Sequence, residues 1–150
     1  MIYDMKWNHI GPFVAAFPIP DYYVSEEDIQ DSLQRCYPFN VIQPTTGAKV
    51  DLVPLPRDPF TRAAFQRRQR LEYDEAGHSA TFITPEDIIV AKLIAHRETE
   101  SDKHLRDARG VLMMQWGELD LEAMRRGARA GRVLEQFDLL LEAVRREIEE

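Results

Sequence analysis

The segment that decides the fold runs Thr84-Pro85-Glu86-Asp87-Ile88-Ile89-Val90-Ala91-Lys92-Leu93-Ile94-Ala95-His96-Arg97 and is followed by Lys103-His104-Leu105-Arg106-Asp107. Thr84 suits an N-cap, and Pro85 suits the first helical position. The next two residues are acidic and favour the positive end of a helix dipole. Apolar residues then recur at helical spacing, among them Ile88, Val90 and Ile94, so the pattern predicts an amphipathic helix over 84–97.

Lys92 interrupts this apolar stripe. It lies one turn after Ile88 and one turn before His96, at the edge of the buried face. A lysine in that position must extend its ammonium to water or meet an anion. Asp107 is one candidate for that anion, and a phosphate group is another.

The length of 150 residues favours one domain over residues 1–150, and 44% hydrophobic residues are enough to form its core. A net charge of -7 argues against a general nucleic-acid coat, although it leaves a local basic groove open. One cysteine, Cys36, excludes a disulfide within the chain and predicts a cytoplasmic protein. No apolar run approaches the ~20 residues of a membrane span, and the N-terminus has no signal-peptide pattern.

Local patterns predict an α+β fold, with strands in 1–83 and helices in 84–150. We expect a short strand at 1–3, helices over 9–17, 25–36 and 58–70, two hairpins with strands 37–43 and 48–55 and then 71–74 and 79–83, and four helices over 84–97, 102–116, 120–130 and 132–149. The hairpins follow from turn residues between alternating strands.

Asp51 is the most unusual strand residue, because it stands between Val50 and Leu52 in a strand expected at the centre of the sheet. A buried carboxylate is costly unless it is paired or bound to a metal. A strand aspartate therefore suggests a ligand for a divalent cation such as Mg²⁺. The other interpretation is an ordinary surface aspartate in a hairpin.

A second group of candidates lies on the predicted helices. Lys92 suits contact with a phosphate, Asp107 suits orientation of Lys92, and positive charge nearby comes from Arg97, Lys103 and Arg106. A structural lysine–aspartate pair explains Lys92 and Asp107 equally well.

Four segments, in this order and spacing, resemble the minimal nucleotidyltransferase-like proteins related to AbiEii-type toxins of toxin–antitoxin systems. They are Lys49–Leu52, Asp58–Ala63, Thr84–Leu93 and Arg106–Leu112. The resemblance extends from about His9 to Leu141. It implies a nucleotidyltransferase fold: a mixed sheet that includes the two hairpins, flanking helices and a C-terminal helical bundle.

The resemblance also implies Mg²⁺ and a nucleoside triphosphate as cofactors. Asp51 matches the later-strand carboxylate that completes the metal set, and Lys92 matches the helix lysine that contacts nucleotide phosphate. Arg106 and Asp107 match the Arg-Asp pair of the next helix. The implied catalytic residues are thus Asp51, Lys92 and Asp107, the metal ligand is Asp51, and the nucleotide-binding residues are Lys92, Arg97 and Arg106.

One departure from the family pattern is large. No Gly-Ser element and no Asp-x-Asp pair precede Asp51. Either the gene product starts further upstream, or this is a shortened member that has lost catalysis. One carboxylate cannot hold two metal ions around the transferring phosphate, so we expect no nucleotide transfer by the chain as given.

Two further expectations concern partners. The groove near Lys92 suits a phosphate or an acidic partner, which makes a binding scaffold an alternative to an enzyme. The open sheet edge near Met1–Asp4 and the wide apolar stripe of the last helix predict a homodimer. The four histidines lack the spacing of a zinc site.

Overall fold

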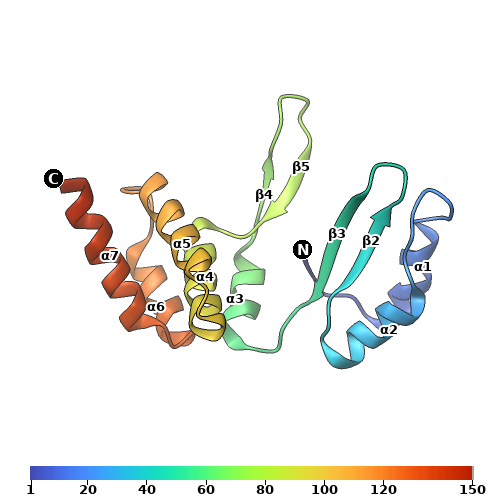
Figure 1. Ribbon diagram of the computed structural model, residues 1–150, viewed down its shortest axis with the longest axis horizontal. Helices are drawn as coiled ribbons and strands as arrows, with labels where there is room; N and C mark the ends of the chain where they lie inside the picture. Colours follow the sequence, from blue (N-terminus) through green and yellow to red (C-terminus); the bar gives the residue numbers. More distant parts are fainter. Residues whose placement is uncertain (150) are drawn as a thin grey trace. The chain divides into compact units, whose positions relative to one another are not determined.

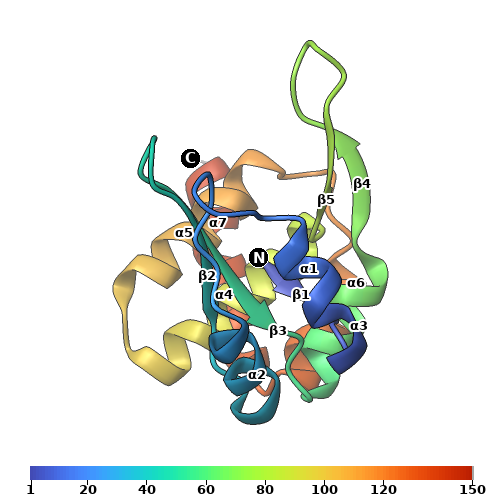
Figure 2. The same cartoon turned by 90° about the vertical axis from the view of Figure 1, so that its right-hand side faces the viewer.

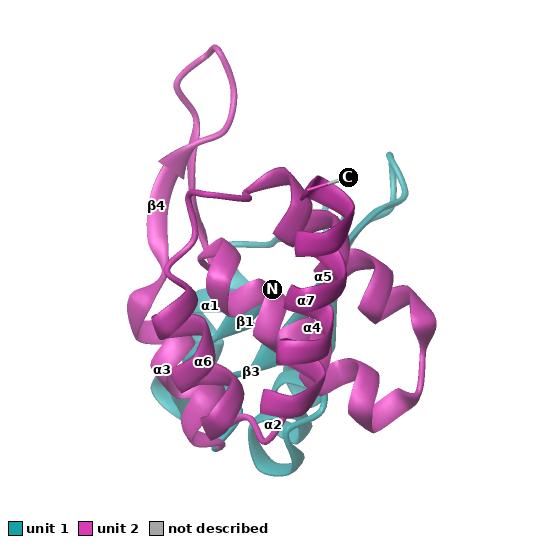
Figure 3. Cartoon of the chain, turned by 90° about the vertical axis from the view of Figure 1, so that its left-hand side faces the viewer, with its two compact units in different colours: residues 1–57 teal, residues 58–150 magenta. Residues whose placement is uncertain are grey.

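The computed structural model describes residues 1–149 and divides the chain into two compact units. The first unit is Met1–Arg57, and the second begins at Asp58 (Figure 3). Each unit has its own hydrophobic core, so each is described by itself. The boundary falls within the strand-rich half of the sequence and precedes the change from strands to helices that we expected near residue 83.

The first unit contains a small mixed sheet, two α-helices and a 3-10 helix. Its elements are β1 (Ile2–Tyr3), η1 (Trp7–His9), α1 (Ile10–Ala15), α2 (Glu26–Arg35), β2 (Phe39–Gln43) and β3 (Ala48–Pro54). The strand order is β1-β3-β2, and Figure 1 shows β2 and β3 side by side. β2 and β3 form the predicted antiparallel hairpin, while β1 pairs in parallel with β3, with Ile2 opposite Val53.

The core of the first unit lies between the sheet and the helices α1 and α2. Figure 2 shows these two helices beside the sheet. Strand alternation explains the choice of residues, because Phe39, Val41 and Leu52 point to the same face. Ile29 of α2 and Ile10 of α1 cover them. Buried Ser32 accepts or donates a hydrogen bond at 2.8 Å with the Tyr3 hydroxyl and so joins α2 to β1.

The second unit is mainly helical. Its elements are α3 (Pro59–Arg67), β4 (Gln69–Glu72), β5 (Ser79–Phe82), α4 (Pro85–Thr99), α5 (Asp102–Met114), α6 (Leu121–Ala130) and α7 (Leu134–Glu149). α3 ends three residues earlier than expected, because Arg68 is extended (ψ 145°) and leads into β4. The four predicted C-terminal helices are confirmed.

The helices of the second unit pack around α4. Thr84 caps α4 as predicted, since its hydroxyl accepts a hydrogen bond from the Asp87 N–H at 3.2 Å. The fully buried face of the helix is Ile89, Val90 and Leu93, whereas Ile88 is only half-buried. The centre of the stripe is therefore shifted by one residue from the predicted one. The rest of the core comes from the other helices, including Phe60, Leu112, Met124, Phe137 and Val144.

The predicted second hairpin is present but is not part of the mixed sheet. β4 and β5 pair with each other in a separate two-stranded sheet. The fold class is therefore α+β, with a mixed sheet, a separate hairpin and a helical C-terminal region. No helix within residues 1–149 has the length and apolar character needed to cross a membrane.

Candidate functional site

Lys92 and Asp107 meet in the structure, so the first of the two candidate anions lies beside Lys92. The Lys92 Nζ lies 2.7 Å from an Asp107 carboxylate oxygen and joins α4 to α5. The two side chains are 30% and 35% exposed, so the pair lies at the edge of the core and is open to solvent. The lysine at the border of the apolar stripe thus reaches an anion supplied by the chain itself.

Two further residues of α5 share the face of Asp107. Lys103 and His104 precede Asp107 by four and three residues, which is the spacing of neighbours on one helix face. The hydrogen bond from Lys92 holds the pKa of Asp107 below its ordinary value; partial burial opposes this effect, and the charges of Lys92, Lys103 and His104 reinforce it. We call Lys92, Lys103, His104 and Asp107 the α4–α5 site.

His104 contributes an unpaired polar atom to this site. Its Nδ1 is buried and has no hydrogen-bond partner among residues 1–149. His96, one turn after Lys92, is satisfied, because its Nδ1 lies 3.1 Å from the Ser101 carbonyl oxygen at the α4–α5 connection. The sequence pattern of the four histidines bears only on a zinc site and gives no indication of the position of His104 beside Asp107.

Arg106 does not share this face. Adjacent residues on a helix diverge by about 100°, so Arg106 points away from the face of Asp107. It is exposed and has no ion-pair partner in the described part of the chain. The contact of Arg106 with nucleotide phosphate stays a prediction. The position of Arg106 does not support it, because Arg106 lies on a different face of α5 from Asp107, the partner of Lys92.

Arg97 is engaged elsewhere in the second unit. Its Nη1 donates to the carbonyl oxygens of Gly131 and Arg132, at 2.8 and 3.1 Å, and its Nη2 lies 3.4 Å from Glu98. The carbonyl groups at the C-terminus of a helix have no intrahelical partner, so Arg97 satisfies those that follow α6. This is a structural role, which ties α4 to the α6–α7 connection.

Asp51 lies in the first unit, on the face of the sheet opposite the helices. Its register partner is Asn40, and its carboxylate lies 3.1 Å from Lys49 Nζ. The side chain is 63% exposed, so the energetic argument for a buried carboxylate that needs a partner does not apply. Its backbone oxygen accepts a hydrogen bond from the Met1 ammonium at 2.7 Å.

The residues around Asp51 do not fit a magnesium site. Within residues 1–149, no three His, Cys, Asp or Glu side chains lie close enough together to hold a metal ion. Mg²⁺ binds through one or two carboxylates together with substrate phosphates. A single exposed carboxylate paired with Lys49 therefore offers little to a metal by itself.

An ion pair between half-exposed Arg67 and buried Asp87, which the sequence did not indicate, supports α4. Arg67 donates two hydrogen bonds to Asp87, which is only 5% exposed. The pair borders a small hollow at the N-terminal ends of α4 and α6, where Glu86 also accepts a hydrogen bond from the Asp120 N–H at 3.3 Å. Asp87 looked like an ordinary first-turn acid, and only the distant Arg67 explains its burial.

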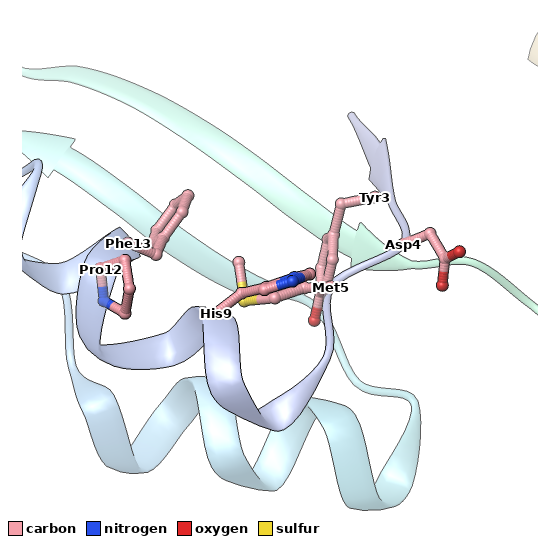
Figure 4. A pocket seen from close by; sticks show the side chains of 6 residues that line it. All are labelled: Tyr3, Asp4, Met5, His9, Pro12 and Phe13. Carbon is pink, nitrogen blue, oxygen red and sulfur yellow. The ribbon is translucent and has the colours of Figure 1, made fainter.

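The first unit has a shallow pocket of its own, which the sequence did not indicate (Figure 4). It is lined by Tyr3, Asp4, Met5, His9, Pro12 and Phe13. Asp4 is paired with Lys6 at 2.9 Å, and His9 accepts a hydrogen bond from the Lys6 N–H. The polar groups at its rim are thus used within the chain.

Comparisons with protein-family models, with curated proteins and with solved structures found no match to this chain.

Proposed function

We propose that this chain is a nucleotidyltransferase-like protein that binds a phosphate group at the α4–α5 site and does not transfer nucleotides by itself. The observation that carries the proposal is the contact between Lys92 and Asp107, at 2.7 Å, on the two helices that the family resemblance singled out. Lys103 lies on the same face and adds a donor. The single cysteine favours a cytoplasmic location.

The proposed ligand is the polyphosphate of a nucleoside triphosphate. Lysine binds phosphate as a flexible point charge, and Lys92 is exposed enough to exchange the Asp107 carboxylate for a phosphate oxygen. Lys103 then supplies a second cation to the same anion. Asp107 keeps the Lys92 ammonium in place while no phosphate is bound.

Calorimetric titration with ATP, with and without Mg²⁺, tests this binding. We expect saturable binding that Lys92→Ala weakens at least tenfold. Lys6→Ala is the matched control, because Lys6 pairs with Asp4 on the surface of the first unit. Equal ATP affinity in the wild-type protein and Lys92→Ala would refute the assignment of the site.

We expect no nucleotide transfer, because the chain lacks the acidic residues that would hold the metal ions. Nucleotidyl transfer depends on metal ions that hold both the attacking and the leaving oxygen. Asp51 is the only strand carboxylate that matches the family pattern, and Lys49 neutralises it. Incubation with labelled nucleoside triphosphates and with RNA or protein acceptors should give no incorporation. Incorporation that Asp51→Ala abolishes would contradict this part of the proposal.

A second candidate function, an active Mg²⁺-dependent nucleotidyltransferase in a longer chain, is favoured by the register of β1. Ile2 pairs with Val53, so an extension of β1 would place the residue two positions before Ile2 beside Asp51, on the same face of the sheet. A carboxylate there would complete a pair with Asp51. The reading frame upstream of the Met1 codon decides between the two: an in-frame Gly-Ser and Asp-x-Asp favours the enzyme.

A further inference from the structure

The β4–β5 hairpin exposes an apolar face. Leu71, Tyr73 and Phe82 are 49%, 61% and 41% exposed. They share one face, because Leu71 lies opposite Ala80, Phe82 lies opposite Gln69, and the Tyr73 ring stacks on His78. The hairpin stands away from the helices of the second unit (Figures 1 and 3). An isolated two-stranded hairpin is only marginally stable in water. Burial of this apolar face against another surface would stabilise it.

The outer edge of β4 is also unpaired in the described part of the chain. Hydrogen-bonded pairs alternate along an antiparallel ladder. The Tyr73 N–H donates to the His78 carbonyl, so Leu71 also bonds inward to β5. The backbone N–H and C=O groups of Arg70 and Glu72 therefore point outward, and such an edge is a template for another strand.

The side chains of the same two residues carry opposite charges. Arg70 and Glu72 are the neighbours of Leu71 in the strand, and their side chains lie on the opposite, polar face of the hairpin. Arg70 donates through Nε to the Ser79 hydroxyl at 2.8 Å, which leaves its terminal nitrogens available. Glu72 has no ion-pair partner within residues 1–149. An antiparallel partner strand with the same sequence, centred on Leu71, would place an arginine opposite each glutamate.

We propose that the chain forms a homodimer through β4, in which two copies pair antiparallel about a two-fold axis at Leu71. Arg70 of each copy then lies opposite Glu72 of the other. The two residues exchange backbone hydrogen bonds, and their side chains carry opposite charges. The result is one continuous sheet in the order β5–β4–β4–β5. Its apolar face joins Leu71, Tyr73 and Phe82 of both copies.

The ladder and the charges together select this register. The outward backbone groups allow only registers in which Arg70 and Glu72 form the hydrogen-bonded pairs with the same residues of the other copy. Among these registers, the charges favour the one that places Arg70 opposite Glu72. β5 offers no such match, because Ser79–Phe82 has no charged side chain. The interface differs from the β1 edge predicted from the sequence, and it does not depend on the proposed phosphate site.

Charge reversal tests the proposal, with sedimentation equilibrium of the full chain as the readout. Arg70→Glu and Glu72→Arg each place like charges opposite each other twice and should raise the dimer dissociation constant about tenfold or more. The double variant R70E/E72R restores opposite charges and should restore the wild-type constant. Ile2→Lys, at the exposed edge of β1, is the matched control and should leave it unchanged.

Cysteine cross-linking reports the register directly. Leu71 would face Leu71 of the other copy as a non-hydrogen-bonded pair, with Cα atoms about 4.5 Å apart, a separation within disulfide reach. In a Cys36→Ser background, Leu71→Cys should give a covalent dimer with diamide as the oxidant. Met114→Cys, at a residue that is 84% exposed, should give no covalent dimer under the same conditions.

Three results would overturn the proposal. The first is a monomeric protein at the highest soluble concentration. A monomer whose hairpin amides are protected from hydrogen exchange would show that the chain covers its own hairpin, and it counts against the proposal in the same way. The second is a dimer whose stability neither single charge reversal changes. The third is a Leu71→Cys protein that cross-links no faster than Met114→Cys. Circular dichroism of each variant confirms that the fold is intact.

Discussion

Arg67 holds both carboxylate oxygens of Asp87, at 3.0 Å from Nε and 2.6 Å from Nη2. The bond joins the last turn of α3 to the first turn of α4. Because α4 carries Lys92, this pair fixes the direction of the helix on which the α4–α5 site depends. Its bidentate geometry is of the kind that gives arginine–carboxylate pairs their strength and direction.

Arg67→Ala should lower the free energy of unfolding by about 2 kcal/mol, because the buried Asp87 carboxylate loses its charged donors. The half-exposed position of Arg67 keeps the effect below that of a fully buried pair. Arg62→Ala, an exposed arginine of the same helix, should change the value by less than about 0.5 kcal/mol. Urea unfolding of the two variants measures the difference. Equal free energies of unfolding would show that the Arg67–Asp87 pair does not stabilise α4.

Asp107 should contribute to acid sensitivity. Its pKa is lowered in the folded protein by the hydrogen bond from Lys92. A carboxyl group with a depressed folded pKa stabilises the fold above its unfolded pKa, and this contribution is lost as the pH falls through the folded pKa. The loss should therefore begin near the ordinary value of 3.8 and continue below it.

Lys92→Met should remove most of this depression. A ¹³C NMR titration of the Asp107 carboxyl is expected to show a higher pKa in Lys92→Met than in the wild-type protein. The stability of the variant should fall less as the pH is lowered below 3.8. Lys6→Met serves as the control for loss of a surface lysine. An unchanged Asp107 pKa in Lys92→Met would mean that the pair does not persist in solution.

Two glycines in the second unit should respond to alanine in opposite directions. A Cβ at Gly131 would lie 2.6 Å from Ile94 Cδ1, so Ile94 must move and the unfolding free energy should fall by about 1 kcal/mol. A Cβ at Gly110 in α5 meets nothing within 4 Å, and alanine there should stabilise the helix by about 0.5–1 kcal/mol. Thermal unfolding compares the two variants, and stabilisation by Gly131→Ala would show that the approach of Ile94 is looser than described.

Local chemistry made the helices predictable. Ser25, Asp58, Thr84 and Asp120 each precede a helix and accept a hydrogen bond from the backbone N–H three residues later. A signal of this kind lies within one helical turn of sequence. The meeting of Lys92 and Asp107 was predictable for a related reason, because consecutive helices joined by a short connection lie side by side.

The rest of the site could not be predicted, because it depends on residues distant in sequence. The acceptors of Arg97 are carbonyl groups at Gly131 and Arg132, and no side-chain pattern marks a backbone acceptor. Asp87 is buried only because Arg67 reaches it. Strand alternation separates the face of Asp51 from that of Leu52, but it does not indicate which of the two faces is covered.

NMR of the isotope-labelled protein during a titration with ATP shows whether the Lys92–Asp107 pair opens to a phosphate. We expect the Lys92 side-chain signals and the Asp107 carboxyl to shift progressively with ATP, together with the Lys103 and His104 signals, while Lys6 and Asp4 stay unchanged. Shifts confined to other residues, or no shift of Lys92 at millimolar ATP, would contradict the account.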